Sequence, residues 1–272
     1  MQTTHNYRPR FYFGITFLTT FLLWSLGALM SFSETYDRYY MLVMLPGLIA
    51  PFAVSTWIIL RSGDRKLKQE FRQRLFDLRL MRASTLPFLI LVMPIVVLIS
   101  ALISLLFGQP VTQFQPAEGF SFSTGFVPVL LLLLMAAAFE ELGWRGYAYD
   151  SLEDRFSRFK ASLIFGGLWS LWHLPLVFVK DSYQYEILQQ NPLFALNFFV
   201  GIIPLGFIIS WVCIKNRKSI PAAILFHFII NLSQEMLAIT QITKCIETGV
   251  LVLVAAALVL SDREFFFNRN TR

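Results

Sequence analysis

Two glutamates that interrupt an apolar stretch have the clearest potential for chemistry. Glu140 and Glu141 follow residues 127–138, which carry no charge, and Arg145 comes four positions after Glu141. A charged side chain near the centre of a membrane helix costs about 2.5–3.5 kcal/mol on insertion scales. An ordinary helix end among lipid headgroups would also accept these charges. Three of them within six residues favour a functional site.

Two histidines and an asparagine occupy other apolar stretches. His173 lies in one of them, and His227 lies four residues before Asn231 in another. If these stretches are membrane helices that rise 1.5 Å per residue, then Glu140, His173 and His227 lie about 14, 18 and 10 Å from the same membrane face. Groups that agree in depth are expected to face one water-filled cavity.

Spacing along each helix assigns different roles to the two glutamates. Glu141 and Arg145 stand at positions i and i+4, so they share a helix face and are expected to form an ion pair. Glu140 is turned about 100° from Glu141 and is therefore free to face the cavity. His227 and Asn231 are also at i and i+4 and direct their polar atoms toward one point.

These residue types support hydrolysis. A buried Glu140, assisted by His173, can deprotonate a water molecule, while His227 and Asn231 hold the developing oxyanion. The same side chains offer an alternative use as zinc ligands. The chain has no His-Glu-x-x-His, Gly-x-Ser-x-Gly or Gly-x-Gly-Asp motif. We expect no metal or other cofactor, with zinc as the alternative.

The composition is that of a polytopic membrane protein. The 272 residues are 56% hydrophobic and only 15% charged, with a mean hydropathy of +0.60. A soluble chain carries about 25% charged residues. The net charge of +6 therefore reflects membrane topology, and we expect no nucleic-acid partner.

The apolar segments predict an all-α integral membrane protein with about eight spans. It forms a single domain, 1–272, whose catalytic core covers about 126–240, and polar loops are expected at 180–191 and 241–248. The basic segment 61–82 is either a helix in the headgroup layer or a solvated loop. The predicted spans are 11–30, 41–60, 86–107, 126–149, 161–179, 192–214, 220–240 and 249–260.

The basic residues orient these spans. All but three of the 23 lysines and arginines (Arg38, Lys180 and Lys244) then fall on one side of the membrane. The positive-inside rule makes that side the cytosol, so both termini are predicted to be cytosolic and the cavity to open there. The expected location is the cell membrane in a prokaryote or the endoplasmic reticulum in a eukaryote.

Three motifs connect these residues to a known family. They are Glu140-Glu141-x-x-x-Arg145, the segment from Trp169 to His173, and His227-x-x-x-Asn231. In order and spacing, over about residues 126–240, the chain resembles the CAAX protease and bacteriocin-processing (Abi) family. Within it, the chain is similar to the type II CAAX prenyl endopeptidases, the Ras-converting enzyme type. The family usually has Phe where this chain has Trp169.

The resemblance implies an intramembrane endopeptidase of the glutamate type that removes the C-terminal tripeptide from prenylated CAAX proteins. Glu141 and Arg145 would orient the site or bind the carboxylate of the tripeptide. The substrate's C-terminus would approach through membrane lipid, with its isoprenoid between helices. An older view of the family makes it metal-dependent. A proton-coupled transporter and a non-catalytic immunity protein remain the alternatives.

Overall fold

The computed structural model describes residues 5–119 and 128–268, and the regular elements in these ranges are all helices. Six of the described helical segments are long and apolar enough to cross a membrane, which confirms an all-α integral membrane protein. The α-helices of these segments are α1 (Pro9–Ser31), α2 (Tyr40–Arg61), α4 (Leu86–Leu105), α7 (Arg158–Trp172), α9 (Pro192–Lys215) and α11 (Gln241–Ser261).

The predicted fourth and seventh spans are built differently. The fourth, 126–149, covers α5 (Val129–Gly143) and a π-helical turn η5 (Trp144–Ala148) and ends at the first residue of α6 (Tyr149–Glu153), while residues 126 and 127 lie outside the described ranges. The seventh is α10 (Ile220–Glu235), which is capped by the Ser219 side chain, an acceptor for the backbone N–H of Ala222. Because α5 and α10 have only 15 and 16 residues, the number of eight spans stays a prediction.

Both predicted polar loops were wrong, because hydroxyl side chains cap helices there. Ser182 accepts a hydrogen bond from the backbone of Tyr185 and begins α8 (Tyr183–Gln190). Thr240 does the same for Thr243, so 241–248 belongs to α11. Segment 61–82 contains a helix, α3 (Arg65–Phe76).

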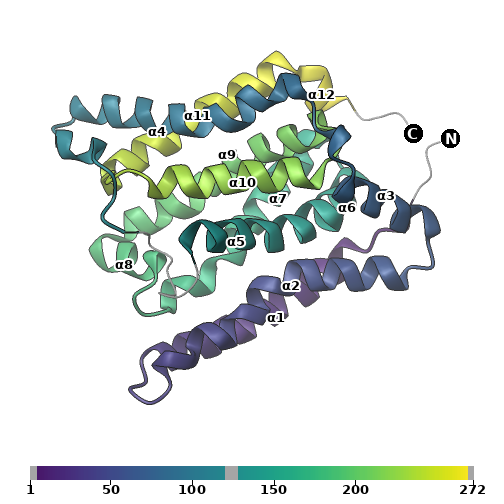
Figure 1. Ribbon diagram of the computed structural model, residues 1–272, viewed down its shortest axis with the longest axis horizontal. Coiled ribbons are helices and arrows are strands. Elements are labelled where there is room, and N and C mark those ends of the chain that lie inside the picture. The colour runs from purple at the N-terminus through teal and green to yellow at the C-terminus, as the bar shows by residue number, and fades with distance from the viewer. Residues whose placement is uncertain (1–4, 120–127, 269–272) are drawn as a thin grey trace.

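The helices form a bundle whose two ends differ (Figure 1). α1 and α2 pack together on one side of the bundle, and α4 packs with α11 on the other. α5 and α10 pack against each other between these pairs, and α7 packs against α9. The short helices α3, α6 and α12 (Arg263–Phe267) gather at one end, and α8 lies at the other.

Proline and glycine bring α2 close to its neighbours. Pro51 cannot donate to the carbonyl of Gly47, and the Thr20 hydroxyl of α1 binds that carbonyl instead at 2.9 Å. Next to Pro51, the backbone of Gly143 of α5 lies so close to α2 that an added Cβ would be 2.3 Å from the carbonyl carbon of Pro51. The glycine thus allows the helix carrying the two glutamates to touch the α2 backbone.

The end of α10 nearest α8 meets the loop after α4. The backbone N–H of Ala117 donates to Met236 at 3.1 Å, and that of Ala238 donates to Gln115 at 3.0 Å. One turn away, the Thr243 hydroxyl binds the buried amide of Gln113 at 2.6 Å. We call this hydrogen-bonded pairing of residues 113–117 with 236–243 the end plug.

Candidate active site

Glu140 lies near the C-terminal end of α5 and is almost fully buried, with 6% of its surface exposed. Two indole N–H groups donate to the same carboxylate oxygen, Oε2. Trp169 of α7 does so at 2.7 Å, and Trp144, one turn after Glu140, at 3.3 Å. Among the described residues, Oε1 has no hydrogen-bond donor and is left for another group.

Glu141 joins two other groups of the site and is completely buried. Its Oε2 accepts from Arg145 Nε at 2.8 Å, so the ion pair that the i, i+4 spacing predicts is present. Its Oε1 contacts His227 Nδ1 at 3.0 Å. A carboxylate only accepts, so Nδ1 of His227 carries the proton in this contact. Glu141 therefore fixes the orientation of His227.

Arg145 completes the buried ion pair from the π-helical turn. Its Nη1 donates to Ser210 of α9 at 3.1 Å, and its guanidinium stacks 4.2 Å from the ring centre of Phe165. Within the described ranges, Nη2 has no hydrogen-bond partner. Glu141 therefore supplies most of the negative charge that compensates the buried guanidinium.

His173 ends α7 and is held by the backbone. Its Nδ1 lies 2.8 Å from the carbonyl oxygen of Trp169, which can only accept. The proton is therefore on Nδ1, and Nε2 of the neutral ring keeps its lone pair. The helix stops here because Pro175 follows, and a short 3-10 turn (Leu174–Phe178) continues the chain.

Glu140, His173 and His227 come together around the Trp169 ring. The Trp169 ring lies 5.2 Å from that of His227 and 6.2 Å from that of His173, measured between centroids. Glu140 lies close enough to interact electrostatically with both imidazoles. Asn231 follows His227 by one turn of α10 and is half-buried. No residue in the described part of the chain hydrogen-bonds to its side chain.

Sequence reasoning missed three partners of the site. The indoles of Trp144 and Trp169 donate to Glu140, and the Ser210 hydroxyl accepts a hydrogen bond from Arg145. The i, i+4 spacing of Glu140 and Trp144 was a usable signal. Trp169 carries a donor that the family's usual Phe lacks, whereas nothing in the pattern around Ser210 points to Arg145.

The end of the bundle next to the site is tied to α3. Arg74 of α3 donates to the backbone carbonyl of Arg145 at 2.6 Å and forms an ion pair with Asp150 of α6. Lys218 contacts the other Asp150 oxygen at 2.8 Å. Burial alone would raise the pKa of Asp150, but the charges of Arg74 and Lys218 outweigh it and hold the pKa at about 2.

Several of these side chains are of types that can bind a metal. In the described ranges, no group of three or more His, Cys, Asp or Glu residues is arranged to hold a metal ion. Nδ1 of each imidazole is engaged and Glu141 pairs with Arg145, whereas Nε2 of both rings and Oε1 of Glu140 have no hydrogen-bond partner among the described residues. The absence of a metal stays a prediction, and no step below is routed through a metal.

The helices and the buried carboxylates define an integral membrane protein with a hydrolytic type of site. Residues 122–233 match the family model described as type II CAAX prenyl endopeptidase Rce1-like. Over 269 residues, 99% of each chain, the sequence is 58% identical to the CAAX prenyl protease 2 of Methanococcus maripaludis. The chain belongs to the type II CAAX prenyl endopeptidase family, which confirms the resemblance and the prediction of a membrane endopeptidase.

Proposed function

We propose that the protein cleaves prenylated CAAX proteins after the prenylated cysteine and releases the C-terminal tripeptide. The relative in Methanococcus maripaludis carries the name CAAX prenyl protease 2. Our proposal rests mainly on the burial of Glu140 between two indole donors, with one carboxylate oxygen unoccupied by any described donor. That oxygen is the general base of the reaction.

Water activation divides between two residues. Glu140 Oε1 takes a proton from water as the water oxygen attacks the carbonyl carbon of the scissile peptide bond. His173 offers its Nε2 to the same water, because its Nδ1 is committed to the Trp169 carbonyl. The proton then passes to the leaving amine as the C–N bond breaks. The products are a prenylcysteine carboxylate and a free tripeptide.

The oxyanion is stabilised from α10. Because Nδ1 of His227 donates to Glu141, its Nε2 carries a second proton only when the ring is an imidazolium. Glu141 supplies the counter-charge for that form. The imidazolium Nε2–H and the Asn231 amide then donate to the negative oxygen of the tetrahedral intermediate. Glu141 and Arg145 act as positioning residues.

The substrate reaches this site from the cytosolic side, with its isoprenoid in the surrounding lipid. Basic residues gather at one end of the bundle, on α3, directly after α6 (Arg155 and Arg158) and in the turn before α10, and the positive-inside rule supports a cytosolic position for that end. Both ends of the described chain lie at that same end (Figure 1). The termini are accordingly cytosolic in this proposal.

Glu140→Ala and His173→Ala test the mechanism. Purified protein in detergent is given a farnesylated CAAX peptide and the same peptide without the prenyl group. We expect cleavage of the farnesylated peptide alone and a loss of about 100-fold or more in kcat for each variant, the range typical of general acid–base catalysis. Substantial activity in Glu140→Ala, with unchanged thermal stability, would refute the assigned base.

The metal-free mechanism is tested on the same preparation. We expect active protein to contain no stoichiometric zinc by elemental analysis and to keep its activity after dialysis against a chelator. Loss of activity with the chelator and its recovery with added zinc would favour the metal alternative.

A further inference from the structure

Trp169 contacts every reacting group that the proposed mechanism uses on α5 and α7. Its indole Nε1 donates to Glu140 at 2.7 Å, and its backbone carbonyl accepts from His173 Nδ1 at 2.8 Å. Its ring also meets the His227 ring edge-on, with centroids 5.2 Å apart. One buried residue, with 4% of its surface exposed, thus sets the relative placement of base and histidine.

We propose that Trp169 is a positioning residue for catalysis and that its indole N–H selects which oxygen of Glu140 acts as base. This inference rests on the proposed function. The indole occupies Oε2, so only Oε1 is free to meet a water molecule. A Phe at this position, as the family usually has, keeps the ring but leaves Oε2 with only the longer contact from Trp144.

The two indoles are not equal in this arrangement. The Trp144 contact is longer, at 3.3 Å, and comes from the same helix as Glu140. The Trp169 contact comes from α7, the helix that also carries His173, and so links the two helices. Loss of the Trp169 donor therefore allows the carboxylate to rotate away from His173, whereas loss of the Trp144 donor leaves that link intact.

Trp169→Phe removes only the donor, because the ring and the backbone carbonyl remain. Trp24→Phe is the matched control, since Trp24 is equally buried and its indole donates at 2.9 Å to the Met44 carbonyl, away from the site. We expect kcat of Trp169→Phe to fall about 10- to 100-fold, with KM within about twofold of wild type. Trp24→Phe should keep wild-type kcat.

The outcomes separate this inference from the function on which it rests. An active Glu140→Ala variant would refute the proposed base. If Glu140→Ala is inactive but Trp169→Phe has wild-type kcat, the positioning role of Trp169 is refuted and the function stands. An equal loss of kcat in Trp24→Phe would show that any lost indole bond has this effect, which also refutes the special role of Trp169.

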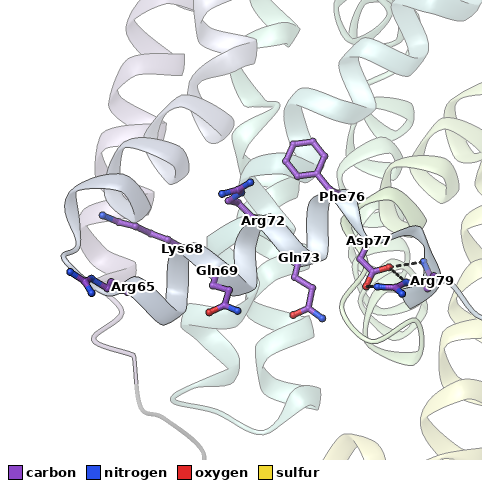
Figure 2. Close-up of a pocket in the computed structure, with 8 residues that line it drawn as sticks. All are labelled: Arg65, Lys68, Gln69, Arg72, Gln73, Phe76, Asp77 and Arg79. Atoms are coloured by element: carbon purple, nitrogen blue, oxygen red, sulfur yellow. Dashed lines mark hydrogen bonds and ion pairs between the residues drawn. The ribbon is translucent and has the colours of Figure 1, made fainter.

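A second, independent observation concerns the outer face of α3 (Figure 2). Lys68, Arg72 and Phe76 follow one another at i, i+4 and i+8 and project from one side of the helix. Neither cation forms an ion pair with any described residue, whereas Lys66 pairs with Glu70. Phe76 is 72% exposed. Two unpaired cations thus stand beside an exposed aromatic ring.

The opposite face of α3 is fixed to the bundle. Leu67 is buried, the Phe71 ring packs against Gly146 of the π-helical turn, and Arg74 binds Asp150. α3 also connects two membrane helices, α2 and α4, so it lies at the boundary of the bilayer. Its outer face is therefore held at the level of the lipid headgroups.

We infer that Lys68 and Arg72 bind the phosphate of anionic phospholipids while Phe76 enters the acyl region. Unpaired cations complement a phosphate, and an exposed aromatic side chain at this depth gains from contact with lipid tails. Arg79, on the same surface, is already paired with Asp77 at 2.8 Å (Figure 2). It therefore contributes less to lipid binding.

Lipid titration of the purified protein tests this surface. Short-chain phosphatidylglycerol and phosphatidylcholine are added separately in neutral detergent, and binding is followed by thermophoresis. We expect tighter binding of phosphatidylglycerol and a loss of about 30-fold in Lys68→Gln/Arg72→Gln, from about fivefold per cation. The control Lys66→Gln/Arg79→Gln removes the same charge from paired cations and should keep the preference.

Three results would overturn the inference. The Lys68→Gln/Arg72→Gln variant could retain the preference for phosphatidylglycerol, which places the lipid elsewhere. Both double variants could lose the preference equally, which makes it an effect of net charge. Inorganic phosphate could displace the lipid at equal concentration, which identifies a site for free anions.

Discussion

Replacing Glu141 separates its effect on stability from its effect on catalysis. The Glu141 and Arg145 side chains are 0% and 1% exposed, and their atoms meet at 2.8 Å. Glu141→Met keeps the approximate shape of the side chain but leaves the guanidinium without its counter-charge. Glu141→Met/Arg145→Met removes both charges and fills the same space with apolar atoms.

The two variants should differ in stability. Removing one partner of a buried ion pair costs about 3–5 kcal/mol, because the other charge stays buried and uncompensated. Among the described residues, Arg145 would keep one hydrogen bond, to Ser210, and its contact with the Phe165 ring, while Nη2 already has no hydrogen-bond partner. Replacing both partners by apolar side chains is often neutral. The double variant should therefore unfold near the wild-type temperature, and the single variant well below it.

Activity should not follow stability. His227 loses its acceptor at Nδ1 in both variants, so its ring is no longer held as an oriented imidazolium. A hydrogen bond to a charged group contributes about 1.5–3 kcal/mol, which corresponds to about 10- to 100-fold in kcat/KM. Thermal unfolding followed by tryptophan fluorescence and cleavage of the farnesylated peptide measure the two effects. Recovery of wild-type activity in the double variant would refute the orienting role of Glu141.

Two further predictions concern the supports of the site. Gly143→Ala places a Cβ 2.3 Å from Pro51 and should lower the free energy of unfolding by about 1–3 kcal/mol, measured by thermal unfolding. Gly167→Ala is the control, because its added Cβ meets no atom within 4 Å and should leave the stability unchanged. The pKa of Asp150, about 2, lies below the ordinary value of 3.8, so the ion pairs with Arg74 and Lys218 stabilise the folded state by about 2 kcal/mol above pH 4. This stabilisation is lost as the pH falls toward 2. Unfolding measured between pH 5 and 2 should show that loss, and Asp150→Asn should flatten it.

The sequence predicted the parts of the fold that depend on apolar length. Continuous runs of apolar residues gave the six long spans, and the i, i+4 rule gave the Glu141–Arg145 pair. Helix caps decided what the polar stretches do. Residues 241–248 look like a loop because of Lys244 and Glu247, but the Thr240 cap begins the helix before them.

Contacts between segments that are distant along the chain could not be predicted from the sequence. The pairing of Glu141 with His227 spans 86 residues, and that of Trp169 with Glu140 spans 29. Periodicity says which face of a helix a residue occupies but not which neighbour meets that face. The π-helical turn after Gly143 is equally invisible, because its residues read as a simple continuation of the helix.

The end plug has a consequence for the membrane in which the protein sits. A polar interior within a bilayer is a potential leak for ions and protons. In the end plug, residues 113–117 are hydrogen-bonded to residues 236–243. The two segments lie at the end of α10, beyond Asn231. Backbone without regular helix is tolerated at such depth only where protein satisfies its polar groups. We expect a hydrolase built this way to admit water from the α3 end of the bundle and to leak few ions through the other end.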